Sequence, residues 1–192
     1  MTRFWWVRHG PTHEKAFVGW RDVPADLSDT ARLARLDAHL PKGALIVSSD
    51  LIRASATAAV LAKGREALPA DPALREINFG AWDGLHWSEA SARDPELTRA
   101  FWETPGDIAP PEGESWNAVA ARVDGFVARM LAAHPGRDIV AVAHFGVILT
   151  RVQQAGGLTA EAALGHQIEP LSVTRTEYSA TGWHLGDIGT CP

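Results

Sequence analysis

The stretch Arg3–Gly10 (RFWWVRHG) decides the fold that we expect for this chain of 192 residues. Its four consecutive apolar residues, three aromatic and one β-branched, predict a buried strand. The strand ends in Arg8 and His9, and Gly10 then permits a turn. Because open α/β sheets bind ligands at the carboxyl ends of their strands, this stretch predicts a strand that carries two polar groups to a binding site.

Two further apolar runs end in the same way. Residues 44–47 (ALIV) lead through a short polar turn into a predicted helix that carries Arg53 near its start. Residues 139–143 (IVAVA) end at His144, where another helix is predicted to begin. Strand, short turn and helix in succession are typical of a parallel sheet. Since the carboxyl ends of parallel strands face the same way, the polar residues of all three segments are expected to meet at one edge.

The other predicted elements follow from apolar periodicity and from Pro and Gly as breakers. Together they predict one three-layer α/β/α domain over residues 1–192 with a mostly parallel sheet. A long loop is expected over residues 11–24. The remaining predicted elements are a helix from the N-cap Ser28 to about Leu40, the Arg53 helix to about Lys63, an edge strand at 67–70, two helices over 87–103 with a break near Asp94 and Pro95, helices over 115–131 and from Gly146 to about Ala155, and a late hairpin of strands 172–178 and 181–185.

Composition limits the possible partners. The net charge of −5 and the pI near 5.9 argue against nucleic acid as a partner, because phosphate-backbone binding needs a basic face. The single cysteine, Cys191, forms no internal disulfide, which fits a reducing compartment. No apolar run approaches the roughly 20 residues of a membrane helix, and no signal-peptide pattern opens the chain. We therefore expect a cytoplasmic protein without a membrane partner; the sequence does not indicate its oligomeric state.

Two arginines and two histidines at successive strand ends, Arg8, His9, Arg53 and His144, suit phosphoryl transfer. Arginine binds phosphate oxygens bidentately, and one imidazole can attack phosphorus while the other stabilises its oxygens. The leaving oxygen needs a proton, so a carboxylic acid must lie nearby. The residues alone do not choose among the available carboxylates. The candidates in the next loop and helix are Glu76, Asp83 and Glu89.

Five motifs in order carry a resemblance to a known family. The chain resembles the histidine phosphatase superfamily, also called phosphoglycerate mutase-like, over nearly its whole length. The matching segments are residues 8–12 (RHGPT), 19–24 (GWRDVP) with Leu27 and Ser28, 48–58 (SSDLIRASATA), 74–76 (LRE) with 80–84 (GAWDG), and 111–115 (PEGES) with 142–148 (VAHFGVI).

The resemblance implies a role for each matching residue. His9 is expected to be the nucleophile and Glu76 the proton donor, with His144 as the third catalytic residue. The expected substrate-binding residues are Arg8, Gly10, Thr12, Arg53 and His144. No cofactor and no metal are expected, since the histidines also lack a ligand spacing such as HxxxH.

Some positions depart from the family pattern or stand outside it. Lys15 stands where relatives often carry asparagine, and Phe145 stands where glycine is common. Both leave open how the pocket is lined. His13 and His86 are candidate substrate contacts, while His39, His134 and His184 are expected at the surface. Candidate pocket tryptophans are Trp20, Trp82 and Trp87.

The resulting hypothesis is a metal-independent phosphatase that hydrolyses a small-molecule phosphomonoester through a phosphohistidine. The aromatic loops suggest an apolar or ring-bearing leaving group. One alternative is phosphoglycerate mutase-type transfer, although the segment after Glu76 offers only Arg93 and Arg99 to hold a doubly anionic substrate. The other alternative is a non-catalytic phospho-ligand binder. The sequence does not name the phosphomonoester.

Overall fold

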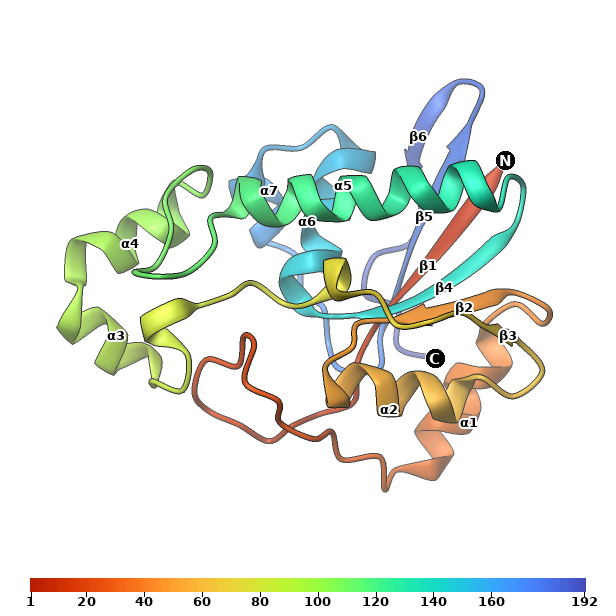
Figure 1. Ribbon diagram of the computed structural model, residues 1–192, viewed down its shortest axis with the longest axis horizontal. Helices are drawn as coiled ribbons and strands as arrows, with labels where there is room; N and C mark the ends of the chain where they lie inside the picture. The colour runs from red at the N-terminus through yellow and green to blue at the C-terminus, as the bar shows by residue number, and fades with distance from the viewer.

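A six-stranded sheet runs through the centre of the molecule, as the computed structural model of residues 1–192 shows (Figure 1). The strand order is β3-β2-β4-β1-β5-β6. The first four strands in that order are parallel, and β5 and β6 form an antiparallel hairpin at one edge, so the sheet is mostly parallel, as predicted. The strands are β1 (Thr2–Arg8), β2 (Leu45–Ser48), β3 (Glu66–Ala67), β4 (Asp138–Ala143), β5 (Val173–Ser179) and β6 (Gly182–Leu185).

Helices cover both faces of the sheet, which gives the predicted three layers. Figure 1 shows α5, α6 and α7 above the sheet, α1 and α2 below it, and α3 and α4 at the left-hand end. No helix is long and apolar enough to cross a membrane. The helices are α1 (Thr30–His39), α2 (Ile52–Leu61), α3 (Trp87–Arg93), α4 (Pro95–Glu103), α5 (Trp116–Ala133), α6 (Phe145–Gly156) and α7 (Ala160–Leu164), with short 3₁₀ turns at Pro72–Leu74 and Gly80–Trp82.

Alternation along β1 distributes its side chains between two cores. Phe4 and Trp6 are fully buried in the larger apolar cluster, with residues of α5 and α6. Val7 is equally buried in the second cluster, against α1 and α2. Neighbouring residues on a strand point to opposite faces, so a strand buried on both sides reads as a continuous apolar run. This explains why the run FWWV (residues 4–7) carries no polar interruption.

Three predicted boundaries differ from the observed ones. The N-cap of α1 is Asp29 and not Ser28, because the Asp29 side chain accepts the hydrogen bond from the amide of Arg32. The edge strand β3 is only Glu66–Ala67, and Pro69 beyond it has no N–H to offer a ladder. Helix α2 ends at Leu61, two residues before the predicted end.

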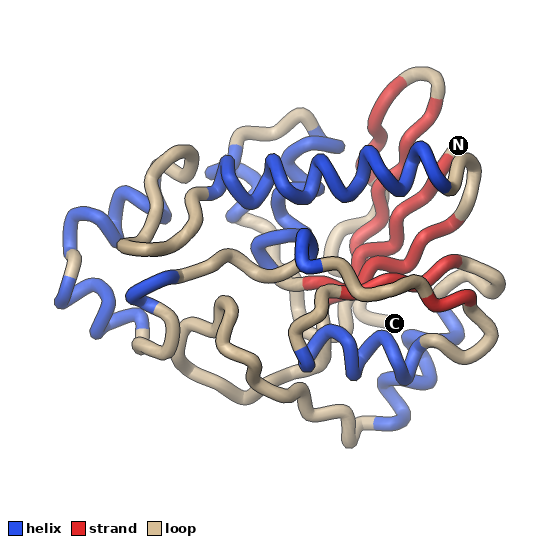
Figure 2. The backbone as a smooth tube through the Cα atoms, in the orientation of Figure 1, coloured by secondary structure: helices blue, strands red, loops and turns tan.

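The carboxyl ends of β1 and β4 lie side by side at the point where the chain reverses its direction across the sheet. From β1 the chain passes over β4 to β2, whereas β5 joins β1 on the other side. Arg8 is in register with Ala143, and the amide of His9 donates to the Ala143 carbonyl at 3.1 Å. The sheet therefore places His9 and His144 next to each other at its switch point. The loop that follows β1 lies in the left and lower part of Figure 2, whereas β4 leads through His144 directly into α6.

The buried side chain of Arg65 connects the C-terminal ends of α1 and α2. The guanidinium of Arg65 donates to the carbonyls of Leu61, Asp37, Leu40 and Pro41 and pairs with the Asp37 carboxylate. These carbonyls belong to the ends of the two helices, where they lack partners within the helix.

We predict that Arg65→Met lowers the free energy of unfolding by about 3 kcal/mol, because it leaves buried carbonyls without a donor and the Asp37 carboxylate with only its exposed Lys42 partner. Urea denaturation of purified variants measures this. Lys63→Met, at an exposed position without a side-chain hydrogen bond, serves as the control and should stay within about 0.5 kcal/mol of wild type. Equal stability of the two variants would contradict this role for Arg65.

Candidate active site

His9 follows the end of β1 with its ring held in one tautomer. Its Nδ1 lies 2.7 Å from the Gly10 carbonyl oxygen, which can only accept, so Nδ1 carries the hydrogen. The lone pair of Nε2 is therefore free. The pKa of His9 is lowered to about 3, chiefly by burial and also by the charges of Arg53 and Arg8, while the Gly10 contact opposes the shift. The ring is neutral at physiological pH and has an available nitrogen lone pair.

His144 follows β4 and holds the opposite tautomer. Its Nδ1 accepts a hydrogen bond from Arg53 Nε at 3.2 Å, so the hydrogen of the neutral ring lies on Nε2. Burial, together with the neighbouring charges, lowers the pKa of His144 well below its usual value. Nε2 is buried without a hydrogen-bond partner, and the ring centroid lies 5.0 Å from that of His9. An unpaired N–H donor thus lies beside the free lone pair of His9.

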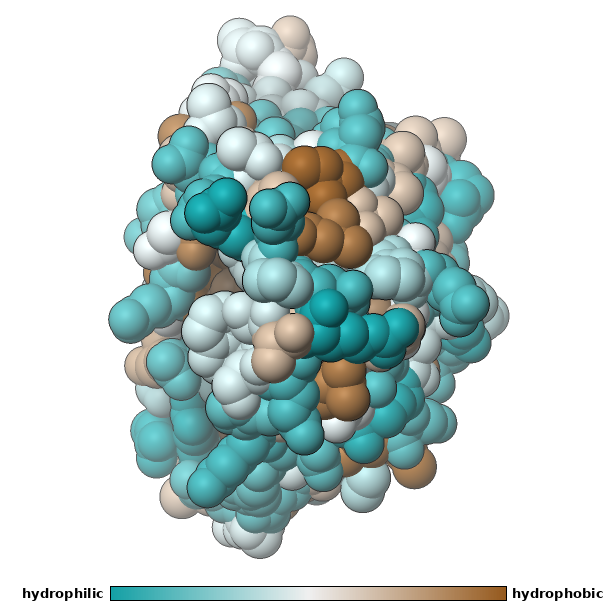
Figure 3. Space-filling view, turned by 90° about the vertical axis from the view of Figure 1, so that its left-hand side faces the viewer, coloured by the Kyte–Doolittle hydropathy of each residue, from teal (hydrophilic) through white to brown (hydrophobic).

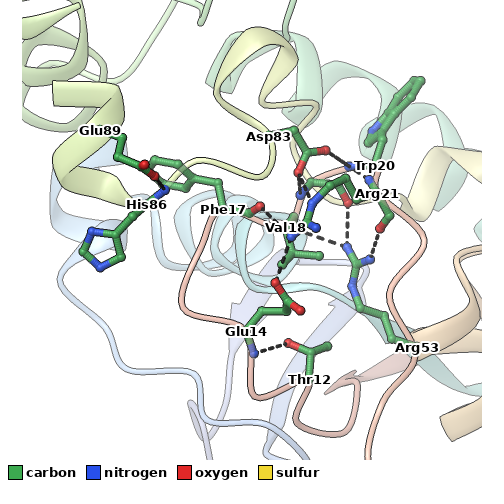
Figure 4. Close-up of polar contacts among 11 residues, drawn as sticks. Thr12, Glu14, Phe17, Val18, Trp20, Arg21, Arg53, Asp83, His86 and Glu89 are labelled. Carbon is green, nitrogen blue, oxygen red and sulfur yellow. Dashed lines mark hydrogen bonds and ion pairs between the residues drawn. The ribbon is translucent and has the colours of Figure 1, made fainter. Parts of the chain in front are cut away.

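Arg53, on the first turn of α2, is 1% exposed. Besides its bond to His144, it donates to the carbonyls of Gly19 at 2.6 Å, Arg21 at 2.9 Å and Val18 at 3.4 Å (Figure 4). These carbonyls belong to the loop after β1. Arg53 therefore shapes this loop and fixes the His144 tautomer, a role that the sequence did not indicate.

Arg8 has donors that no protein group satisfies. One of its terminal nitrogens donates to the Ile168 carbonyl at 2.6 Å, whereas its buried Nε has no partner. Its guanidinium carbon lies 5.6 Å from the centre of the Phe145 ring. Burial lowers the pKa of Arg8, and nearby carboxylates of Glu76 and Glu169 oppose the shift. A largely buried cation with free N–H groups is suited to an anionic ligand.

Glu76 is 6% exposed, and its carboxyl group is held by backbone amides. Its Oε1 accepts from the amides of Ile77 and Gly146, both at 3.0 Å. Burial raises the pKa of Glu76, although these amides and the charges of Arg53 and Arg8 act in the opposite direction. A β-carbon on Gly146 would lie 2.6 Å from Oε1, so only glycine permits this approach. Burial thus shifts Glu76 toward its protonated form, and its other carboxyl oxygen accepts no hydrogen bond from the protein.

The main chain of Glu76 is fixed as well. Its carbonyl accepts hydrogen bonds from Trp20 Nε1 at 2.9 Å and from a terminal nitrogen of Arg122 at 2.8 Å. Arg122 also pairs with Glu114, whose carboxylate accepts the amide of Asn78. Three separate segments thus hold the acid in place. Sequence analysis missed the contribution of Arg122, because nothing in a helical arginine indicates which distant carbonyl it meets.

A cavity of ≈ 260 Å³ is lined by His9, Arg8, Arg53 and Glu76, whereas the fully buried His144 is not part of its lining. Figure 3 views the molecule from the α3–α4 end, where hydrophobic residues appear only as small patches among hydrophilic ones. No group of three or more His, Cys, Asp or Glu side chains is arranged as a metal-binding cluster. The cavity has a polar lining of Arg8, His9, Thr12, Glu14, Arg53 and Glu76, and an apolar lining of Ala16, Phe17, Val18, Phe79, Trp102 and Phe145.

Two of the expected substrate-binding residues, Gly10 and His144, do not line the cavity, and His144 is fully buried. Gly10 does not line the cavity: its amide donates to Thr57 Oγ1 at 3.0 Å, and a β-carbon there would lie 2.6 Å from Leu27. It acts on His9 through its carbonyl. Lys15 is exposed and also lies outside the lining, whereas Phe145 lines the cavity next to Arg8.

Both candidate histidine contacts lie at the surface instead. His13 pairs with Asp26 at 2.8 Å, and His86 caps α3. Neither lines the cavity, because each ring is used within its own loop or helix end.

None of the three candidate pocket tryptophans lines the cavity. Trp82 is fully buried in the core, with its indole nitrogen on Asp94, and Trp87 is 58% exposed on α3. Trp20 acts on Glu76 without lining the cavity. The tryptophan that does line it is Trp102, which α4 brings over the loop after β1.

Comparison with known proteins identifies the family to which this chain is similar. The family model of the histidine phosphatase superfamily (branch 1) matches residues 4–190. The bifunctional protein Rv2228c of Mycobacterium tuberculosis is 38% identical over 128 residues, which are 66% of this chain and 33% of that protein. The adenosylcobalamin/alpha-ribazole phosphatase of Escherichia coli is 29% identical over 83% of this chain and 82% of its own. A 2,3-bisphosphoglycerate-dependent phosphoglycerate mutase of Methylobacterium is 32% identical over 84% of each.

Solved structures of similar proteins share the fold of this chain. Bacillus stearothermophilus YhfR superimposes with a TM-score of 0.90 at 27% identity, covering 100% of this chain and 98% of its own. The mycobacterial glucosyl-3-phosphoglycerate phosphatase Rv2419c gives 0.85 at 29% identity, covering 99% of both. With this fold and a family match over nearly all of its length, the chain belongs to the histidine phosphatase superfamily.

Proposed function

We propose that this protein hydrolyses a small-molecule phosphomonoester through a phosphohistidine on His9, without a metal. The observation that carries the proposal is the pair of opposite tautomers at the sheet edge. A free Nε2 lone pair on His9 lies beside an unpaired Nε2–H on His144. A nucleophile and a hydrogen-bond donor for the phosphoryl oxygens are thereby combined with the unsatisfied cation of Arg8.

In the first step, Nε2 of His9 attacks phosphorus and the bond from phosphorus to the leaving oxygen breaks. The leaving oxygen takes the proton of the Glu76 carboxyl group, so an alcohol departs and Glu76 becomes a carboxylate. Free N–H groups of Arg8 and the Nε2–H of His144 stabilise the phosphoryl oxygens. The raised pKa of Glu76 and the lowered pKa of His9 suit these starting states.

In the second step, water attacks the phosphorus of phospho-His9 while the Glu76 carboxylate removes a proton from it. The P–N bond breaks, inorganic phosphate forms, and both side chains return to their starting states. Glu76 donates one proton in the first step and takes one proton from water in the second, so the full reaction needs no other acid or base. Relatives named as phosphatases support this hydrolytic reading.

Phosphoglycerate mutase-type transfer is the second candidate, supported by the likeness to the Methylobacterium mutase. Arg93 and Arg99, the basic residues that could have held a second anion, bind Asp94 and Glu103 instead and do not line the cavity. Turnover of 2-phosphoglycerate to 3-phosphoglycerate in a coupled assay, faster than phosphate release, would favour the mutase.

The proposed function predicts that His9→Ala lowers kcat on 4-nitrophenyl phosphate with chelator present by at least about 10⁴-fold, because the covalent route is lost. Rapid quenching of wild type with a ³²P-labelled ester should trap an acid-labile phosphoenzyme that the variant lacks. His39→Ala, at an exposed position near the end of α1, should retain wild-type activity. Full activity of His9→Ala, or a phosphoenzyme in that variant, would refute the assignment.

Glu76→Gln should impair esters according to their leaving group. For an alkyl ester such as 2-phenylethyl phosphate, kcat/KM should fall by about 10²–10⁴-fold, because the alkoxide needs a proton. For 4-nitrophenyl phosphate, whose leaving group is stable as an anion, the loss should stay near about tenfold or below. Glu96→Gln, exposed on α4, is the matched control. Equal losses on both esters would rule out proton donation by Glu76.

The two tautomers can be observed directly by long-range ¹H–¹⁵N NMR of the imidazole nitrogens. Lowered pKa values mean that neutral rings persist as the pH falls past the ordinary histidine value. Between pH 8 and pH 5 we expect His9 to keep its hydrogen on Nδ1 and His144 to keep its hydrogen on Nε2. An imidazolium signal from His9 at pH 6 would contradict the geometry on which the first step depends.

A further inference from the structure

We propose that the site selects phosphomonoesters whose leaving group carries one flat apolar ring and no second anionic group. This rests on the proposed hydrolysis and deepens it. The cavity has an apolar aromatic wall, and Glu14 in its lining belongs to an acidic cluster whose other members lie outside the lining. Each makes its own contribution to the selectivity.

The wall consists of three aromatic rings from three segments. Phe17 lies in the loop after β1, Phe79 in the loop before α3, and Trp102 on α4. The Phe17 and Trp102 rings are nearly parallel, 13° apart with centroids at 6.1 Å, and Phe79 lies 4.9 Å from Phe17. Phe17 and Trp102 are each partly exposed. Aromatic surfaces that keep an uncovered side favour stacked or edge-on contact with another ring.

The acidic cluster consists of Glu14, Asp83 and one arginine. Glu14 lines the cavity and pairs with Arg21 at 3.0 Å, while Arg21 also lies 3.4 Å from Asp83 (Figure 4). Two carboxylates and one guanidinium leave one net negative charge. A carboxylate or second phosphate on the leaving group would meet repulsion from this net negative charge, and salt screens that repulsion because Glu14 is exposed.

No basic residue in the cavity offsets this repulsion. Arg8 and Arg53 are the only lysines or arginines that line it, and both lie beside His9 and Glu76, where the phosphoryl group would bind. Lys15 is adjacent to Glu14 in sequence but is exposed and not part of the lining. A cavity of ≈ 260 Å³ has room for a single ring beyond the phosphoryl group.

The selectivity can be measured with three alkyl esters, so that leaving-group acidity stays similar. These are 2-phenylethyl phosphate, ethyl phosphate and 3-phosphoglycerate. We expect kcat/KM for 2-phenylethyl phosphate to exceed that for each of the other two by about tenfold or more. Higher kcat/KM on 3-phosphoglycerate would overturn the inference while leaving the phosphatase intact. Failure on all three esters and on 4-nitrophenyl phosphate would instead refute the proposed function.

Substitutions separate the contribution of the aromatic wall from that of the acidic cluster. The aromatic contribution is tested at Trp102. Trp102→Ala should reduce the ratio of kcat/KM for 2-phenylethyl over ethyl phosphate by about 3–10-fold. Trp102→Leu, which keeps apolar volume but no ring, should reduce the same ratio and guards against misfolding of the alanine variant. The control is Trp87→Ala, because Trp87 is 58% exposed outside the cavity and should leave the ratio unchanged. Unchanged ratios in both Trp102 variants would overturn the aromatic half.

Glu14→Gln tests the charge half. It should raise the ratio of kcat/KM for 3-phosphoglycerate over 2-phenylethyl phosphate by about 5–10-fold, because the acidic cluster then has no net negative charge. The increase should diminish at high ionic strength. An unchanged or lower ratio would show that Glu14 does not exclude anions. Glu96→Gln on exposed α4 is the matched control.

Discussion

The buried guanidinium of Arg53 is the interaction on which the site depends. A charge that is 1% exposed must find acceptors, and Arg53 finds them in the loop after β1 and in Nδ1 of His144. The same side chain therefore sets two things at once: the path of the loop that lines the cavity, and the ring nitrogen of His144 that bears the hydrogen. Loop conformation and protonation state cannot vary independently here, because they share one buried cation.

The electrostatic state of the site follows from this burial. Two arginines lie beside two neutral imidazoles and a carboxyl group whose pKa is raised by burial, so the site has an excess of positive charge. A dianionic phosphoryl group is the natural complement. The excess is confined to the end of the cavity beside His9. The sign reverses at Glu14, so in the proposed reaction the charges orient a substrate with its phosphoryl group toward His9 and a neutral group toward Glu14.

What the sequence could predict depended on how local the physical cause was. A strand buried on both faces is recognisable in the sequence as the uninterrupted apolar run FWWV. As expected, His9 and His144, which follow β1 and β4, lie together at the switch point. Glu76 could not be chosen from the residues alone, because its partner amide belongs to Gly146, 70 positions away. The pocket tryptophan was missed for the same reason: burial of Trp82 and exposure of Trp102 depend on where α3 and α4 pack.

The side chains of the site are held to different degrees. Glu76 is held through both its carboxyl group and its carbonyl by groups that do not touch the cavity contents, including the amide of Gly146 and Arg122. Arg8, in contrast, keeps free donors and rests on Phe145. An acid positioned by backbone contacts cannot follow the substrate, so the leaving oxygen must come to it. The shape and charge of the wall that receives the leaving group then decide which esters reach that position, which makes the aromatic wall and the acidic cluster part of the catalytic geometry.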